Sequence, residues 1–343
     1  MPRLDDLATR NPAAAARLGI VLLILGLAVV AMVDALVKLL SADLPMVMIQ
    51  WGRFCTGLAI LLPIVLAVGG RAIWSPSRPL THLLRAGVMA PATLLFGTAI
   101  SGMPLADAIA IAFVYPFMIA VLAVVFLNER ASLRDWIAIA GGFVGVLIVM
   151  RPDFGHIDGH AVLAFITGCL FAAYLIMTRT LSGDAGALQL AFYPILVSAL
   201  TFSLIVPQHW VTPSTYHVLL LVITGTISVL AHGIIILAVR LAPAPRLAPF
   251  GYSEIIWAVL IGFLLFGDLP DAVTWLGIAV IVSSGVLIAL RGARTDDAAA
   301  TVEIAEAEPF DVAGFNPGAA HENTMQQEGP SAAALPTPAE RNP

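Results

Sequence analysis

The stretch LGIVLLILGLAVVAMVDALVKLL, residues 18–40, contains only two charged side chains, Asp34 and Lys38. About 20 consecutive apolar residues are enough for a helix to cross the hydrocarbon core of a bilayer. Similar runs recur along most of the chain, whose 343 residues are 59% hydrophobic and 11% charged. Soluble domains are about half apolar and a quarter charged. The sequence therefore predicts an all-α polytopic membrane protein and excludes an ordinary soluble enzyme.

Apolar stretches separated by Arg, Pro, Gly and Asp predict ten membrane spans. The spans are expected at residues 18–40, 46–68, 80–100, 104–127, 133–150, 160–180, 187–206, 216–239, 246–267 and 273–290. The first one lacks a small-residue cleavage site, so we expect a retained helix and not a signal peptide. Residues 1–17 form a short N-terminal segment. Residues 292–343, rich in Ala, Pro and Glu, are expected to be a disordered tail.

Arginines gather on alternate connections between the spans, which predicts the orientation of the chain. If the N-terminus is cytoplasmic, the outer segments carry only Arg151. The cytoplasmic segments then carry thirteen arginines: Arg3, Arg10, Arg17, Arg71, Arg78, Arg85, Arg130, Arg134, Arg179, Arg240, Arg246, Arg291 and Arg294. We therefore expect a multi-pass protein of the cell (inner) membrane with both termini in the cytoplasm.

The two halves of the chain resemble each other at an offset near 140 residues. The aligned pairs are Lys38 with Arg179, Glu129 with Asp268, Trp136 with Trp275, and Arg151 with Arg291. Each half, residues 18–150 and 151–291, contains five predicted spans. Because five is odd, the second half must enter the membrane upside down relative to the first. Inverted repeats of this kind build two exchangeable faces around a midplane site in many secondary carriers.

Several motifs carry a resemblance to a known family. Phe126-Leu-Asn-Glu-Arg130 closes the fourth span, Gly141-Gly-Phe-Val-Gly-Val-Leu-Ile148 lies in the fifth, and Phe266-Gly-Asp268 closes the ninth. Together with the ten spans they resemble the EamA family of the drug/metabolite transporter superfamily. Trp210-Val-Thr-Pro-Ser214 and Pro249-Phe-Gly-Tyr-Ser-Glu254 are similar to the branch that contains S-adenosylmethionine and riboflavin uptake carriers. The resemblance implies transport of a small organic metabolite.

Charged side chains inside spans are costly and mark functional candidates. Asp34 on the first span and Arg53 on the second are expected at the same depth, about 10–12 Å below the outer boundary. They form either a structural ion pair or a part of the cavity wall that binds a zwitterion or a proton. Lys38 lies one turn from the boundary and is expected to extend to the interface.

A second group of candidates lies on the later spans. His232 and Glu254 share a depth about 10–12 Å above the inner boundary, where they form either a hydrogen-bonded pair or a proton-coupling site. Tyr115 and Tyr252 could stack on a flat heterocycle or simply pack. Prolines at 116, 194 and 249 interrupt spans and could open helices around a cavity.

These features favour a secondary transporter that binds a small molecule, with protons as the candidate coupling ion, as a monomer or homodimer. S-Adenosylmethionine, riboflavin or an amino-acid-like compound are the candidate substrates. The alternative is an intramembrane hydrolase or acyltransferase that uses Ser228 and His232, four residues apart on one helix. No phosphate-binding Gly-Lys-Ser/Thr loop is present, and no nucleic-acid partner, metal or cofactor is indicated.

The predicted orientation can be tested with cysteines in two connections. A cysteine at Thr212 should react with an impermeant maleimide in intact cells, whereas a cysteine at Ser77 should react only after permeabilisation, because these connections lie on opposite faces of the membrane. Labelling in the reverse order would contradict the orientation.

Overall fold

The computed structural model of this chain describes residues 12–70, 72–127, 131–151, 158–181, 186–242 and 244–292. Within these ranges ten helical segments are long and apolar enough to cross a membrane, which confirms the ten predicted spans. They are Ala13–Leu40, Met46–Val68, Pro79–Gly102, Leu105–Leu127, Leu133–Met150, Gly159–Leu181, Leu188–His209, Thr215–Leu241, Arg246–Phe266 and Ala272–Ala289. The expected disordered tail lies outside the described residues, apart from Gly292, and so does Glu129.

Eight spans are built on single helices and two are broken. The single helices are α2 (Pro12–Leu40), α3 (Met46–Val68), α4 (Pro79–Gly102), α7 (Leu133–Met150), α8 (Gly159–Leu181), α9 (Ala187–Ile205), α10 (Thr215–Leu241) and α13 (Ala272–Gly292). The fourth span consists of α5 (Leu105–Ala112) and α6 (Tyr115–Leu127), and the ninth of α11 (Ala244–Gly251) and α12 (Ser253–Phe266). Short 3₁₀ turns occur at Ala72–Trp74 (η1) and Val206–His209 (η2).

The breaks occur near two of the three expected prolines. Pro116 has no backbone N–H to donate to the carbonyl of Ala112, the last residue of α5. The second break, at Tyr252, follows Pro249 by three residues. Pro194 lies inside α9 without breaking it, so the expectation of an interruption there was wrong. Within the described residues, only the fourth span of each half is therefore broken into two helices.

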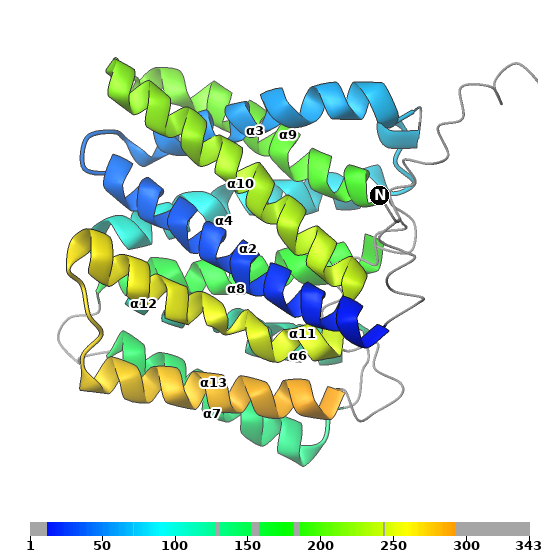
Figure 1. Cartoon of the computed structure of the whole chain (residues 1–343), viewed down its shortest axis with the longest axis vertical. Helices are drawn as coiled ribbons and strands as arrows, with labels where there is room; N and C mark the ends of the chain where they lie inside the picture. Colours follow the sequence, from blue (N-terminus) through cyan, green and yellow to red (C-terminus); the bar gives the residue numbers. More distant parts are fainter. Residues whose placement is uncertain are drawn as a thin grey trace, which may run out of the picture. The chain divides into compact units, whose positions relative to one another are not determined.

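The helices run side by side with their connections at alternating ends (Figure 1). We call the end at which α2 begins the near end, and the end at which it finishes the far end. Helices α7 and α13 pack together at one edge, and α3 packs on α9 at the other. Between them α2 packs on α10 and α12, while α8 packs on α4 and α6. These inner pairs match each other: α2–α10 corresponds to α8–α4, and α2–α12 corresponds to α8–α6.

The crossing of α7 and α13 depends on two glycines. A Cβ atom on Gly145 would lie 3.0 Å from the carbonyl oxygen of Gly277 and 2.9 Å from the backbone nitrogen of Ile281. A Cβ on Gly277 would lie 2.9 Å from the oxygen of Gly145. Small residues allow membrane helices to approach closely, because only van der Waals contacts and polar bonds hold helices together in lipid.

Arg151, the one arginine expected on the outer side, is paired at the far end. It follows α7 in a left-handed conformation with φ 46°, and its Nη2 donates to Asp271 and, at 3.0 Å, to Thr274 Oγ1. The guanidinium of Arg151 lowers the pKa of the exposed Asp271 carboxyl to about 2. The exception to the arginine distribution is therefore neutralised by a neighbouring carboxylate.

The glycine crossing generates a stability prediction. Gly145→Ala should lower the apparent melting temperature in detergent by several degrees, since overpacking costs about 1–3 kcal/mol and backbone atoms cannot move aside. The matched control is Gly87→Ala in α4, where an added Cβ meets nothing within 4 Å. The control should be neutral or slightly stabilising. Equal melting temperatures for the two variants would contradict the role of the crossing.

Candidate functional site

Six ionisable or aromatic side chains from both halves come together inside the helix bundle. We call Asp34, Arg53, Tyr115, His232, Tyr252 and Glu254 the central cluster. Electrostatic interactions join Asp34 to both Arg53 and Glu254, Arg53 to His232, and Tyr115 to both Glu254 and Tyr252. The six come from α2, α3, α6, α10, the break at Tyr252 and α12. The tertiary structure thus brings all the predicted site residues into one neighbourhood.

Arg53 does not form the direct ion pair with Asp34 that equal depth suggested. Its Nε donates to Ser228 Oγ at 3.0 Å, and its guanidinium lies 5.5 Å from the ring centroid of Phe54. Asp34 is nearly buried, at 7% exposure, and interacts with Arg53 through space. The guanidinium is therefore held by α10, which keeps the two opposite charges close without locking them together.

His232 and Glu254 likewise do not bond to each other. His232 Nδ1 contacts the main-chain oxygen of Ser228 at 2.8 Å, while Glu254 lies in the first turn of α12. Arg53, Tyr115 and Glu254 are half-buried and His232 is exposed, although all four lie well inside spans. Charged groups at such depths face the bundle interior or a polar cavity and not lipid.

The Ser228–His232 dyad needed for the enzyme alternative is not formed. Ser228 Oγ donates to the carbonyl oxygen of Thr224 at 2.8 Å and accepts from Arg53. The imidazole contacts the backbone of Ser228 instead of its hydroxyl group. A serine nucleophile needs a base within hydrogen-bond reach of its hydroxyl. This geometry gives no support to the enzyme alternative.

Five aromatic rings extend from the central cluster toward the near end, and we call them the aromatic strip. The ring centroids are 5.3 Å apart for Tyr252 and Phe113, 5.3 Å for Phe113 and Tyr115, 5.2 Å for Tyr115 and Phe171, and 6.0 Å for Phe171 and Tyr174. Sequence reasoning missed Phe113 and Phe171, because they join the strip only where α8 packs against the break in the fourth span.

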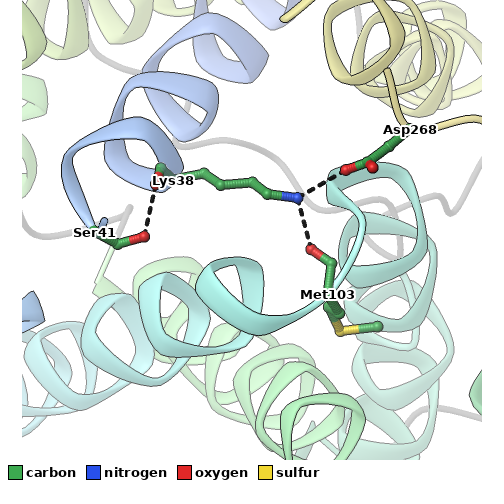
Figure 2. A network of polar contacts seen from close by, with 4 residues as sticks. All are labelled: Lys38, Ser41, Met103 and Asp268. Carbon is green, nitrogen blue, oxygen red and sulfur yellow. Dashed lines mark hydrogen bonds and ion pairs between the residues drawn. The ribbon is translucent and has the colours of Figure 1, made fainter. Parts of the chain in front are cut away.

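An ion pair between the two halves lies at the far end (Figure 2). Lys38 Nζ, at the end of α2, is 2.9 Å from Asp268 Oδ2 and donates to the carbonyl oxygen of Met103 at 2.9 Å. The ammonium also lies 4.7 Å from the ring centroid of Phe266. At this end of its span the Lys38 ammonium is therefore bound by a carboxylate and a main-chain carbonyl that follow two other helices. Gly267, in a left-handed conformation with φ 74°, turns the chain after α12 and presents Asp268.

Sequence reasoning also missed two buried basic side chains near the other end. Arg85 was counted with the cytoplasmic arginines, but it lies inside α4 and is 1% exposed, as is His82 one turn before it. The sequence signal that could have revealed the burial of Arg85 is its position inside the predicted span 80–100.

The EamA-like transporter family matches residues 17–151 and again residues 160–290. The chain belongs to this family. A solved crystal structure has the same fold, with a TM-score of 0.57 at 16% identity, covering 83% of this chain and 99% of its own. As a member of the family, the chain is a secondary transporter of a small metabolite in a membrane.

Named relatives act on different compounds. An S-adenosylmethionine uptake transporter of Rickettsia prowazekii is 24% identical, covering 79% of this chain and 92% of its own length. A riboflavin transporter of Rhizobium johnstonii is 28% identical, covering 64% of this chain and 73% of its own. A pseudopaline exporter of Pseudomonas aeruginosa is 27% identical, covering 77% of this chain and 93% of its own. These relatives include both uptake and export proteins.

The far-end ion pair can be tested with a double-mutant cycle. Lys38→Met and Asp268→Asn should each lower the apparent melting temperature, and the double variant should lose little more than one single variant. A coupling of about 1 kcal/mol or less is expected, because both side chains are partly exposed. Fully additive losses would show that the two side chains do not interact.

Proposed function

We propose that this transporter binds a small metabolite carrying both charges and a flat ring, and moves it by alternating access. The central cluster is the observation that carries the proposal. It offers a guanidinium, two carboxyl groups and aromatic rings at mid-span, drawn from both halves of the chain. A carboxylate on the substrate would bind Arg53, a cationic group would bind Asp34 and Glu254, and a flat ring would stack on the aromatic strip.

The two repeats, residues 18–150 and 151–291, are proposed to be related by inversion. The odd number of spans in each half supports this proposal, as do the matched packing pairs α2–α10 with α8–α4, and α2–α12 with α8–α6. Both halves also open their fourth span at mid-membrane depth. Such symmetry allows the same substrate site to be reached from each side in turn.

Closure at the far end is assigned to the Lys38–Asp268 ion pair. It joins the end of α2 in the first half to the end of α12 in the second, beyond the central cluster. Breaking the pair would allow α2 and α12 to separate there. The near end is proposed to face the cytoplasm, with both termini on that side, because of the arginine distribution.

S-Adenosylmethionine is the candidate substrate that the site fits best. It carries a carboxylate, an ammonium and a sulfonium group together with a flat adenine, and an uptake transporter for it is among the relatives. Riboflavin, the substrate named for another relative, has the flat ring but no charged group that would use Arg53. An amino-acid-like compound would use the charges but not the strip.

Glu254 is proposed as the coupling carboxyl group. It lies in the first turn of α12, next to the break at Tyr252, and has no described cation bonded to it. A carboxyl group in such a place can bind a proton on one side of the membrane and release it on the other.

Flux into proteoliposomes tests both points. Purified protein should accumulate labelled S-adenosylmethionine, and accumulation should increase when a proton gradient is imposed. Glu254→Gln keeps the shape of the side chain but cannot titrate, so it should abolish gradient-driven accumulation while exchange at zero gradient persists. Asp158→Asn, at an exposed carboxylate of the far end, is the control and should behave like the wild type.

Two results would contradict the proposal. If labelled S-adenosylmethionine fails to enter, or if riboflavin enters in its place, the proposed substrate class is wrong. If Glu254→Gln accumulates substrate normally with unchanged pH dependence, the coupling role of Glu254 is wrong, and Asp34 becomes the next carboxyl group to examine.

A further inference from the structure

Arg85 is a charged side chain buried deep in the bundle without a charged partner. It lies in α4, about 9 Å from the near end of that helix, and is 1% exposed. Its Nη1 donates to Thr178 Oγ1 at 3.0 Å and to the hydroxyl of Tyr174 at 3.3 Å, and its Nη2 donates to the carbonyl oxygen of Leu190 at 2.5 Å. All three acceptors are neutral, and no described carboxylate forms an ion pair with Arg85.

Further nitrogen atoms in the same place are left unpartnered. Arg85 Nε has no hydrogen bond, and neither do the two ring nitrogens of His82, which lies three residues earlier on α4 and is also 1% exposed. The imidazole packs against the ring of Tyr193 with centroids 5.1 Å apart. Buried polar groups are nearly always bonded, and intramembrane charges usually lie on a substrate pathway. The buried N–H groups of Arg85 and His82 therefore lack a hydrogen-bond acceptor, and an anionic acceptor suits the charge of Arg85 best.

The aromatic strip leads from the central cluster to this place. Tyr174 is the last ring of the strip, stacked on Phe171 with an interplanar angle of 9°. The guanidinium of Arg85 lies 5.0 Å from the ring centroid of Tyr174 and bonds to its hydroxyl group. Phe171 and Tyr174 are half-buried, so part of each ring surface is accessible. The flat ring of a substrate could move along the aromatic strip while its carboxylate passes from Arg53 to Arg85.

We propose that Arg85 and the near-end part of the aromatic strip form a second substrate position, at which Arg85 binds the carboxylate of the transported molecule. This inference rests on the proposed function and adds to it a position next to the near end. The ligand is a flat heteroaromatic metabolite that carries a carboxylate.

The second position is closed in the structure described. Arg85 bonds α4 to α8 and α9, which all meet near this end. When the near end opens, a substrate carboxylate replaces the neutral acceptors. Its two oxygens can bond to the unpartnered Nε and to Nη2, which share one edge of the guanidinium, and such charge-assisted pairs are stronger than bonds to neutral oxygens. The substrate ring remains stacked on Phe171 and Tyr174.

A purely structural role for Arg85 makes different predictions. If Arg85 only ties three helices together, its loss would reduce the yield and the transport rate regardless of the side to which substrate is added. A binding role affects only the near-end face and only ligands that have a carboxylate. The experiments below separate these two roles.

The first experiment does not require transport. Thr178→Cys, in a chain with Cys55→Ala and Cys169→Ala, is treated with methanethiosulfonate reagents that carry either a sulfonate or a trimethylammonium group. We expect the anionic reagent to react about tenfold faster than the cationic one, relative to a cysteine at the exposed Thr180. Adding Arg85→Gln should remove this preference. No reaction at position 178, or equal rates for both reagents with Arg85 present, would overturn the proposal.

The second experiment measures affinity at each face. In oriented proteoliposomes, Arg85→Gln should raise the KM for S-adenosylmethionine about tenfold at the near-end face and leave the far-end value unchanged, because one charge-assisted bond is lost there. Decarboxylated S-adenosylmethionine should show no such change, and Arg85→Lys should restore part of the affinity. Arg78→Gln, at an exposed arginine that precedes the same helix, is the matched control. Equal changes at both faces, or for both ligands, would show a structural role.

The two experiments also separate this inference from the proposed function. If the wild type does not carry S-adenosylmethionine but the cysteine at position 178 prefers the anionic reagent through Arg85, the substrate assignment fails and the anion position stands. If transport occurs but neither the reagent preference nor the one-sided KM change is found, the proposed function stands and the second position is wrong.

Discussion

The hydrocarbon interior of a bilayer cannot solvate charge, and most features of this structure follow from that constraint. A chain with 11% charged residues places few of them in its spans, and the basic side chains among them bond to specific partners. Lys38 pairs with Asp268, and Arg53 bonds to Ser228 while interacting with Asp34 and His232. Arg85 is the exception, because its acceptors are all neutral. The same rule that explains the other charges therefore points to Arg85 as the proposed anion-binding position.

The broken spans determine where aromatic groups meet those charges. Tyr115 begins α6 directly after the first break, and Tyr252 lies at the second. In an unbroken helix, the helical repeat alone would fix the direction in which these tyrosine side chains point. The breaks instead place Tyr115 within reach of Phe171, and Phe113 between Tyr115 and Tyr252. Half-helices at mid-membrane depth are a common way to build substrate sites in transporters.

The arrangement of the helices connects stability with transport. The edge pair α7–α13 is fixed by close backbone contact at Gly145 and Gly277, which leaves little freedom for sliding. The inner helices pack across the two halves. Helix α2 of the first half packs on α10 of the second, and α4 of the first half packs on α8 of the second. At the far end α2 is joined to α12 by an ion pair, and near the other end α4 is joined to α8 and α9 through Arg85. Polar ties that can exchange partners thus lie at the ends of the proposed pathway, whereas the edge is fixed by close backbone packing of α7 on α13, with the Arg151 bonds at its far end.

The sequence by itself determined the fold class, the ten spans and the residue types available for the site. The reason is that the length and hydropathy of a span are local properties, fixed by bilayer thickness and independent of neighbouring helices. Depth also follows from sequence, which is why Asp34 and Arg53 could be assigned to one level. The lateral position of a side chain does not follow from sequence, because it depends on how its helix is rotated and on which helices that helix packs against. Only the tertiary structure therefore paired Lys38 with Asp268, gave Arg53 to Ser228, assembled the aromatic strip through Phe113 and Phe171, and buried Arg85 among α4, α8 and α9.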